Sequence, residues 1–340
     1  MTKLLLSDPQ SIAEAAESIR SGGLVAFPTE TVYGLGVNAM DAAAVKKVFS
    51  AKGRPSADPL IVHISKLSEI ERVVSSFSPA AQSLADAFWP GPLTLILPKQ
   101  PEVPELVTSK LKTVAVRIPN HPVALALIEA AGTPIAAPSA NRFGHTSPTT
   151  ASHVFQDLAG HIDIILDGGS TSIGVESTIL DLSTTPARIL RPGGITREML
   201  EALIGPVTVF KQIKKLGQKI LSPGMLEKHY APRAEMFLFK GSDADQLLVD
   251  FLTEQKNTGR SIGVLATLES ADAVEQTGAL IYRLGSITDL VSIAQHIYAG
   301  LRWLDDQKVD MIVCRDFGEL GLGLAIQDRL TRAATHVIGN

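Results

Sequence analysis

Residues 24–36 read Leu24-Val25-Ala26-Phe27-Pro28-Thr29-Glu30-Thr31-Val32-Tyr33-Gly34-Leu35-Gly36. The first four residues are apolar and predict a short buried strand. A polar loop with glycines follows the strand directly, and such loops often carry binding residues on a rigid scaffold. The hydroxyls of Thr31 and Tyr33 could hydrogen-bond a small substrate and Glu30 could orient an amine. A plain connection to the next helix is the alternative.

The alternation of apolar strands and helices continues on both sides of this stretch. A helix is predicted over 12–19, because Asp8-Pro9 supplies a cap followed by proline and Gly22-Gly23 ends the pattern. Further helices are predicted over 41–49, 79–88 and 123–131, and strands over 60–64, 93–97, 113–118, 134–137, 162–166, 177–182 and 187–190. We therefore expect an α/β domain built on one large mixed sheet.

The chain of 340 residues is longer than one compact core usually holds, so two domains are expected. After residue 205 the apolar periodicity fades and lysines accumulate. Strands return over 236–239, 262–265 and 311–313, with helices from 244, over 291–304 and over 324–334. The predicted organisation is a first domain over 1–205, a linker over 206–234 and a smaller βαβ-type domain over 235–340.

The composition excludes several classes of protein. Apolar residues make up 45% and charged residues 19%, which is typical of a folded globular chain. The net charge of −4 means that binding to a polyanion requires a local basic patch. Cys314 is the only cysteine, so neither an internal disulfide nor a cysteine metal site can form. We expect a cytoplasmic protein without membrane contact, because neither a signal peptide nor a long apolar segment is found.

Two polar clusters suit an anion, although the common P-loop and hydrolase motifs are missing. Lys52-Gly53-Arg54 places two cations around a glycine, and an arginine can bind a phosphate through two hydrogen bonds. A solvated basic loop is the alternative. Ser139 and Asn141 follow a short strand, and Ser147 comes soon after, where ligands of open α/β sheets gather. Ordinary turn formation is the alternative there.

Charged residues also interrupt two apolar strand segments. His63 lies in the run over 60–64, and Arg117 lies in the run over 114–118. A charge in such a position is costly to bury unless it is paired, and Arg117 stays protonated at any accessible pH. The partner of Arg117 is either an internal acid or a substrate. His63 is either a satisfied core histidine or a ligand contact.

Taken in order, eight short strings resemble the YrdC/Sua5 family of threonylcarbamoyl-AMP synthases. They are P-T-E-T-V-Y-G-L-G (28–36), K-G-R-P (52–55), H-I after a strand (63–64), V-R-I-P (116–119), P-S-A-N (138–141), S-P-T (147–149), E-S-T-I (176–179) and R-P-G (191–193). The strings over 222–225, 228–232 and 321–330 are similar to the Sua5 branch in particular. The resemblance therefore covers nearly the whole chain.

The resemblance implies a large twisted open sheet with a basic cleft, a smaller Rossmann-like C-terminal domain, and a linker that crosses the cleft. It implies a threonine site formed by Thr31, His63, Arg117, Ser177 and the backbone near Ala137. It implies nucleotide contacts from Arg54, Asp58, Thr113, Ser139, Asn141, Ser147, Arg191 and Tyr230, with Lys52 at the phosphates. Residue 58 departs from the family pattern, because many relatives have asparagine there. A carboxylate beside a triphosphate needs to face Mg²⁺ or the ribose.

The implied activity joins L-threonine, bicarbonate or CO₂, and ATP, with Mg²⁺ carried by ATP, into threonylcarbamoyl-AMP and pyrophosphate. This nucleotidyl transfer serves N6-threonylcarbamoyladenosine at position 37 of tRNA. Lys52, Arg54 and Arg117 are expected to be catalytic, because the reaction needs positioning and charge neutralisation. Tyr230 and the linker are expected to act as a lid. Expected partners include tRNA and a downstream threonylcarbamoyl transferase complex.

Three other functions compete with this one. The first is RNA binding in a basic cleft without catalysis, for which the lysines over 211–219 could add contacts. The second is a different carbamoyl or adenylyl transferase, because related domains occur in hydrogenase-maturation proteins. The third is a translation-associated factor whose C-terminal domain docks a partner.

Overall fold

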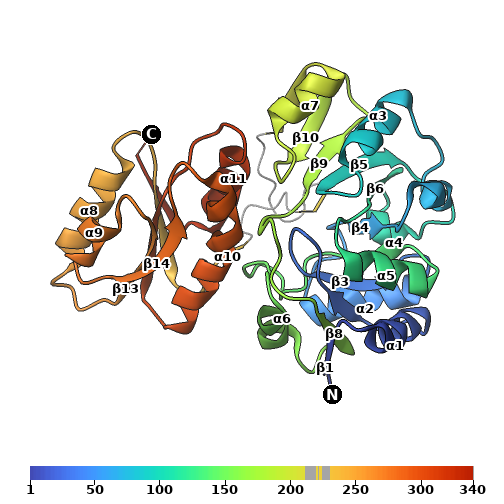
Figure 1. Cartoon of the computed structure of the whole chain (residues 1–340), viewed down its shortest axis with the longest axis horizontal. Helices are drawn as coiled ribbons and strands as arrows, with labels where there is room; N and C mark the ends of the chain where they lie inside the picture. The colour runs from blue at the N-terminus through green and yellow to red at the C-terminus, as the bar shows by residue number, and fades with distance from the viewer. Residues whose placement is uncertain (211–219, 221, 224–229, 340) are drawn as a thin grey trace. The chain divides into compact units, whose positions relative to one another are not determined.

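The computed structural model describes residues 1–210, 220, 222–223 and 230–339, which form two compact units (Figure 1). The first unit holds Met1–Phe143, Ser147–Ser172 and the described residues from Glu176 to Pro223. The second holds Gly144–Thr146, Ile173–Val175 and the described residues from Tyr230 onward. Most of the predicted linker, namely 211–219, 221 and 224–229, lies outside the described residues.

The first unit contains a mixed sheet in the order β1-β8-β2-β3-β7-β4-β6-β5-β9-β10-β11. Its strands are β1 (Lys3–Leu6), β2 (Val25–Phe27), β3 (Gly34–Asn38), β4 (Ile61–His63), β5 (Leu93–Pro98), β6 (Thr113–Arg117), β7 (Ile135–Ala136), β8 (Ile164–Asp167), β9 (Thr178–Asp181), β10 (Ala187–Arg191) and β11 (Val207–Val209). Its helices are α1 (Pro9–Arg20), α2 (Ala42–Lys52), α3 (Pro79–Phe88), α4 (Glu105–Thr108), α5 (Pro122–Ala131), α6 (Ala151–Leu158) and α7 (Arg197–Ile204), with a 3₁₀ turn at Leu67–Arg72. The large mixed sheet confirms the predicted fold class.

Helices cover this sheet unevenly. Apolar residues of α2, α3, α4, α6 and α7 form one continuous core against the first face. On the second face, α1 and α5 cover the half of the sheet made by β1, β8, β2 and β7. The other half of that face carries a separate apolar cluster from β4, β5, β6, β9 and β10, to which none of the described helices contributes.

The second unit is built on five parallel strands in the order β14-β13-β15-β12-β16. They are β12 (Glu235–Phe239), β13 (Ile262–Thr267), β14 (Leu280–Gly285), β15 (Met311–Arg315) and β16 (His336–Ile338), and the helices are α8 (Ala244–Gln255), α9 (Ala271–Glu275), α10 (Leu290–Asp306) and α11 (Gly323–Ala333). Residues of α8 and α9 pack with Val264 and Ala266 on one face. On the other face, Gly263 of β13 packs against Leu304 of α10, and Gly300 of α10 packs against Leu265 of β13. Helix α10 therefore covers this opposite face. This layered parallel sheet agrees with the expected Rossmann-like domain.

Two segments differ from the sequence-based prediction. Residues 28–36 are predicted as a loop, but the last three of them belong to β3 (Gly34–Asn38), which pairs antiparallel with β2 and β7. A Cβ at Gly36 would lie 2.7 Å from Phe27 Cε1 and 2.8 Å from Ile135 Cγ2, so the glycine that suggested a loop is needed for close packing within the sheet. In addition, Val207–Val209 pair with β10 as β11, inside the range predicted as linker.

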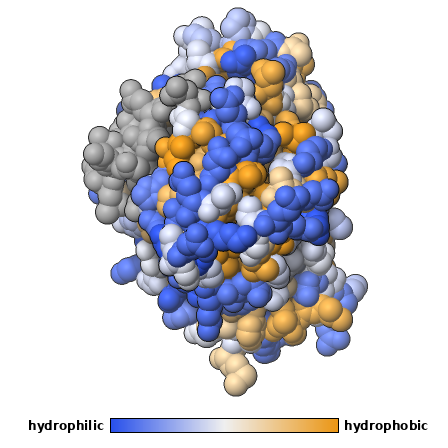
Figure 2. Space-filling model, turned by 90° about the vertical axis from the view of Figure 1, so that its left-hand side faces the viewer, coloured by the Kyte–Doolittle hydropathy of each residue, from blue (hydrophilic) through white to orange (hydrophobic). Residues whose placement is uncertain are grey.

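The surface carries no dominant apolar patch on the face shown in Figure 2, where apolar residues are interspersed with hydrophilic ones. No helix among the described residues is long and apolar enough to cross a bilayer.

Candidate functional site

Strand register brings the predicted site residues to one face of the sheet. β4 and β6 pair in parallel, with Ile61 opposite Ala115 and His63 opposite Arg117. Successive side chains on a strand point to opposite faces, so these four residues share a face. Their neighbours Val62 and Val116 point into the core on the other side. These four side chains lie on the second face of the sheet, in the half that none of the described helices covers.

An apolar floor separates two polar regions on this face. It consists of the cluster Ile61, Ile96, Ala115, Ile179 and Leu190. His63 and Arg117 lie at the ends of β4 and β6, just beyond this floor, whereas Thr113 lies at the opposite end of β6. We call the region at His63 and Arg117 the Arg117 end. The region at the opposite ends of these strands, which contains Thr113 and the Arg54–Asp58 pair, we call the Arg54 end.

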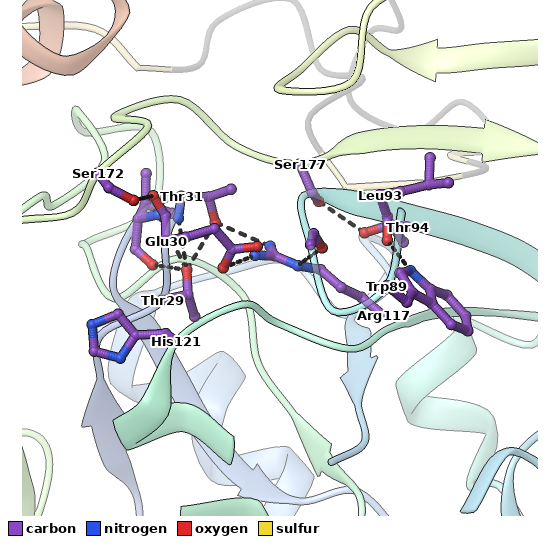
Figure 3. A network of polar contacts seen from close by, with 12 residues as sticks. Thr29, Glu30, Thr31, Trp89, Leu93, Thr94, Arg117, His121, Ser172 and Ser177 are labelled. Carbon is purple, nitrogen blue, oxygen red and sulfur yellow. Dashed lines mark hydrogen bonds and ion pairs between the residues drawn. The ribbon is translucent and has the colours of Figure 1, made fainter. Parts of the chain in front are cut away.

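Arg117 is the centre of the first region (Figure 3). Its Nη2 lies 2.5 Å from Glu30 Oε2, and both side chains are about 95% buried. Nη1 donates a hydrogen bond to Thr31 Oγ1 at 3.0 Å, and Nε donates to Gly91 O at 3.2 Å. Although the Glu30–Arg117 ion pair is close, neither Glu30 oxygen accepts a well-aligned hydrogen bond from the described residues. The carboxylate therefore keeps capacity to accept hydrogen bonds from a ligand.

Ser177 closes the other side of the Arg117 end. Its Oγ lies 2.8 Å from Thr94 Oγ1, a contact drawn in Figure 3. Arg191 donates from Nη2 to Ser177 Oγ and from Nε to Ser177 O, both at 3.0 Å. Ser177 is thus held by the neighbouring strand β5 and by the last residue of β10.

His63 is buried and neutral at physiological pH. Burial, together with the charges of Arg117 and Arg191, lowers the pKa of its imidazole to about 3. Its ring lies edge-on to Phe27, with 6.2 Å between the ring centroids. Nδ1 has no hydrogen-bond partner among the described residues. An uncharged ring with an unused nitrogen suits a small polar ligand better than it suits the apolar core.

The Arg54 end contains a second buried ion pair. Arg54 Nη2 lies 2.9 Å from Asp58 Oδ2, and both side chains are at least 97% buried. Arg54 also donates to the carbonyls of Asp58 and Pro59. Burial raises the pKa of the Asp58 carboxyl, and the charges of Arg54, Lys52 and Arg191 oppose that rise. The charges of all three cations thus influence the Asp58 carboxylate, whereas the ion pair itself is made by Arg54.

Lys52 ties this region to the loop that follows β7. Gly53 ends α2 in the left-handed conformation, with φ of 65°, so Lys52 is the last helical residue. Its buried ammonium donates to Ser139 O at 2.5 Å and also to Asn141 O. Ser139 Oγ in turn donates to Asn141 Oδ1 at 2.5 Å. The predicted phosphate contacts Lys52, Ser139 and Asn141 are thus brought together.

The structure places the remaining predicted residues as follows. Ala137 donates its backbone N–H to Ile61 O at 2.9 Å, which sets it beside the apolar floor. Ser147 donates to Glu176 Oε1 at 2.5 Å. Thr113 pairs with Pro98 at the start of β6. Tyr230 belongs to the second unit, where its buried ring packs on Tyr298 with 5.7 Å between centroids. The nucleotide contact predicted for Tyr230 stays a prediction.

Sequence reasoning missed three partners in this site. Glu30 was considered as an amine ligand but not as the counter-ion of Arg117, since nothing local connects two residues 87 positions apart. Glu176 belonged to a noted motif without an assigned role. Thr94 lies in an apolar strand, and no sequence signal singles it out.

The donor set offers no protein cage for a metal. Among the described residues, no group of three or more histidine, cysteine, aspartate or glutamate side chains could hold an ion. The carboxylate of Asp58, which lies among the site cations, is paired with Arg54. An Mg²⁺ ion that retains water and is bound mainly by nucleotide phosphates fits these residues.

Comparisons with known proteins match both units. Residues 17–193 match the Sua5/YciO/YrdC family, described as "Telomere recombination", and residues 195–335 match the "Threonylcarbamoyl-AMP synthase, C-terminal domain" family. Threonylcarbamoyl-AMP synthase of Bacillus subtilis is 47% identical, over 98% of this chain and 95% of its own. The synthase of Pyrococcus abyssi is 45% identical, over 95% and 94%. A crystal structure of the Pyrococcus abyssi Sua5 protein complexed with L-threonine is 42% identical to this chain and superposes with a TM-score of 0.91. The comparison covers 100% of both chains.

Proposed function

The chain belongs to the two-domain Sua5 family, and we propose that it is an enzyme that joins L-threonine, bicarbonate and ATP into threonylcarbamoyl-AMP. Pyrophosphate and water are the other products. The intermediate serves N6-threonylcarbamoyladenosine formation at position 37 of tRNA. The relatives that match over nearly the full chain bear this name, and the related solved structure holds L-threonine.

One observation carries the proposal. The buried Arg117–Glu30 pair offers one positive and one negative group, which match the carboxylate and ammonium of an amino acid. The charges of Lys52, Arg54 and Arg191 all act on the carboxylate of Asp58, and a group of three such cations matches a polyphosphate. A site that pairs an amino-acid clamp with a phosphate clamp suits amino-acid activation by ATP.

For the threonine half, we infer that Arg117 binds the carboxylate and that Glu30 accepts hydrogen bonds from the amine. Thr31 and Gly91 fix the guanidinium through the two hydrogen bonds described above. Ser177 and the neutral His63 lie close to Arg117 and complete the polar surroundings of the side chain. The backbone near Ala137 borders the same pocket.

The reaction then requires little covalent help from the protein. The neutral amine of threonine adds to CO₂, which bicarbonate supplies with loss of water, and the N–H proton that the new C–N bond displaces passes to solvent. One oxygen of the resulting carbamate then attacks the α-phosphorus of ATP. The P–O bond to the β-phosphate breaks, and the charge that develops on pyrophosphate is stabilised by Lys52, Arg54 and Arg191. Mg²⁺ bound to the phosphates supplies additional charge neutralisation. This would make the enzyme a nucleotidyltransferase.

The apolar floor contributes by limiting water. Carbamates lose CO₂ and mixed anhydrides hydrolyse, so the intermediates survive longer over Ile61, Ile96 and Ala115 than over a hydrated surface. For Asp58, we propose an indirect role as the counter-ion of Arg54, with Thr113, Ser139, Asn141 and Ser147 as nucleotide contacts.

The remaining expectations belong to the same proposal. A labile adenylate calls for a downstream threonylcarbamoyl transferase that consumes it, and the tRNA substrate is consistent with a cytoplasmic location. Contact with tRNA by this chain itself would require a local basic surface, because the net charge is −4.

The decisive experiment measures pyrophosphate release with ATP, Mg²⁺, bicarbonate and each amino acid in turn. The proposal expects release that requires both threonine and bicarbonate. Nucleotide binding without threonine-dependent release would overturn it and favour RNA binding or another transfer reaction. Serine serves as the comparison substrate, because the methyl group of threonine is worth only about 1–3 kcal/mol.

A further inference from the structure

Two short loops belong to the second unit although the chain on both sides of each loop belongs to the first. They are Gly144–Thr146 and Ile173–Val175. Each loop leads directly into the candidate site, because Ser147 follows the first and Glu176-Ser177 follow the second. The backbone therefore connects contacts in the second unit to site residues over one or two peptide bonds.

The first loop is fixed on both sides by hydrogen bonds within the second unit. His145 pairs with Ala231 as an isolated parallel bridge, and the N–H of Ala231 donates to Gly144 O at 2.9 Å. Thr146 Oγ1 donates to Tyr230 O at 3.3 Å. The guanidinium of Arg302 on α10 donates from Nη2 to Thr146 O. Arg302 is about 90% buried, so this charged donor acts with little competition from water.

The second loop lies directly against the backbone of the same helix. Gly174 has a φ of +81°, and a Cβ there would lie 2.3 Å from Ala294 O and 2.5 Å from Gln295 Cα. Any side chain at this position would clash with backbone atoms, which cannot rotate away as a side chain does. Gly174 therefore sets the distance between this loop and α10.

The two loops converge again inside the first unit. Ser147 Oγ donates to Glu176 Oε1 at 2.5 Å, so the residues that follow the two loops are hydrogen-bonded to each other. The next residue, Ser177, contacts Thr94 and Arg191. A displacement of either loop would therefore reach both the threonine and the nucleotide contacts.

We propose that Arg302 and Gly174 are positioning residues for the reaction: through these loops, α10 sets the places of Ser147, Glu176 and Ser177. Neither residue touches a substrate. This inference rests on the proposed function for its kinetic readout, but the positions of 147–149 and 176–178 can be followed without turnover. It assigns the two loops Gly144–Thr146 and Ile173–Val175 a direct part in organising the site.

The test uses the full-length chain and four variants. Arg302→Ala removes the donor to Thr146, Arg302→Lys restores a cation with a donor, and Gly174→Ala introduces the clash. Leu252→Ala is the control, because Leu252 is buried on α8, on the sheet face opposite α10. KM for ATP, KM for threonine, kcat and Tm are measured for each, together with amide hydrogen exchange at Ser147, at Thr149 and over 176–178.

Arg302→Ala should raise KM for ATP about tenfold, because the lost contact involves a charged donor and precedes Ser147. Gly174→Ala should raise KM for threonine about tenfold, because Ser177 lies three residues further on. Arg302→Lys should recover much of the loss. The control should lower Tm while leaving both KM values within about twofold of the wild type. Faster amide exchange at Ser147 and Thr149 should accompany Arg302→Ala but not the control.

The proposal is overturned if Arg302→Ala changes KM and hydrogen exchange no more than Leu252→Ala does. If Gly174→Ala does not fold, the comparison of Arg302→Ala with Arg302→Lys decides alone. A wild-type chain that releases no pyrophosphate with threonine would contradict the proposed function. The exchange data would still support or refute the positioning role in that case.

Discussion

Replacement of Arg117 by alanine tests the centre of the site, because its guanidinium makes three contacts from one buried position. It lies 2.5 Å from Glu30 Oε2 and donates to Thr31 Oγ1 at 3.0 Å and to Gly91 O at 3.2 Å. Breaking a buried ion pair costs about 3–5 kcal/mol, because the remaining charge is left uncompensated. We expect the free energy of unfolding to fall by about that amount, as measured by urea denaturation.

The catalytic loss should be separable from this loss of stability. If Arg117 binds the threonine carboxylate, kcat/KM for threonine should fall by about 100-fold or more, equivalent to about 2.7 kcal/mol of transition-state stabilisation. Initial rates of pyrophosphate release, measured over a range of threonine concentrations at saturating ATP and bicarbonate, give this quantity. The double variant Glu30→Gln/Arg117→Met should recover part of the stability, because both charges are removed, but none of the activity.

Arg188→Ala is the matched control. Arg188 also projects from a strand of this sheet and pairs with a carboxylate, Asp181, at 3.2 Å, but that pair lies outside the site residues. Its loss should leave kcat/KM for threonine nearly unchanged. An Arg117→Ala enzyme that retains kcat/KM within about threefold of the wild type would refute the role of this guanidinium as the carboxylate clamp.

Three further substitutions test the electrostatics of the site. Burial lowers the pKa of His63 from 6.5 to about 3, so the stability that its neutral ring contributes is present above pH 6.5 and is lost as the pH falls toward 3. Between pH 7 and pH 5, the free energy of unfolding of His63→Gln in urea should therefore fall by about 2 kcal/mol less than that of the wild type, and equal losses would contradict the buried neutral state. Burial raises the pKa of Asp58, so its charge is unfavourable in the folded chain at pH 7. Asp58→Asn should release Arg54 for phosphate and tighten ATP binding severalfold by calorimetry, whereas weaker binding would support a direct contact of Asp58 with the nucleotide. Lys52→Met should lower both ATP affinity and the free energy of unfolding, the latter by about 2–4 kcal/mol, because Ser139 O and the buried Asn141 O lose their donor. An unchanged unfolding midpoint would contradict this structural role of Lys52.

The sequence predicted those elements whose apolar periodicity is strong. The strands around 25–27, 61–63, 93–98 and 113–117 formed where short apolar runs occur, because such runs must be buried on both faces. β3 was missed because Gly34 and Gly36 disfavour an isolated strand, and the two glycines are explained by close packing on Phe27, Ile135 and Ala137 in the folded sheet. Local propensity was overridden there by tertiary packing.

For the site, the sequence predicted residue types better than partnerships. The charge of Arg117 in an apolar strand signalled a buried partner, and the choice between an internal acid and a substrate stayed open. The structure supplies the internal acid, Glu30, from a loop that is adjacent only after folding. The pairing of Ser147 with Glu176, and the two loops held by α10, depend on long-range contacts in the same way. No periodicity in the chain encodes them.

The strand β6 has a consequence for the size of molecule that can bind. Its first residue, Thr113, belongs to the predicted nucleotide contacts and its last, Arg117, to the predicted threonine contacts. Four steps of about 3.3 Å along a strand separate their Cα atoms by about 13 Å. This length is set by backbone hydrogen bonds to β4 and β5 and is independent of side-chain rotamers. The distance between Thr113 and Arg117 is therefore fixed by the backbone. Substitutions at either end can change the affinity for one substrate without changing this distance, which the joined product must span.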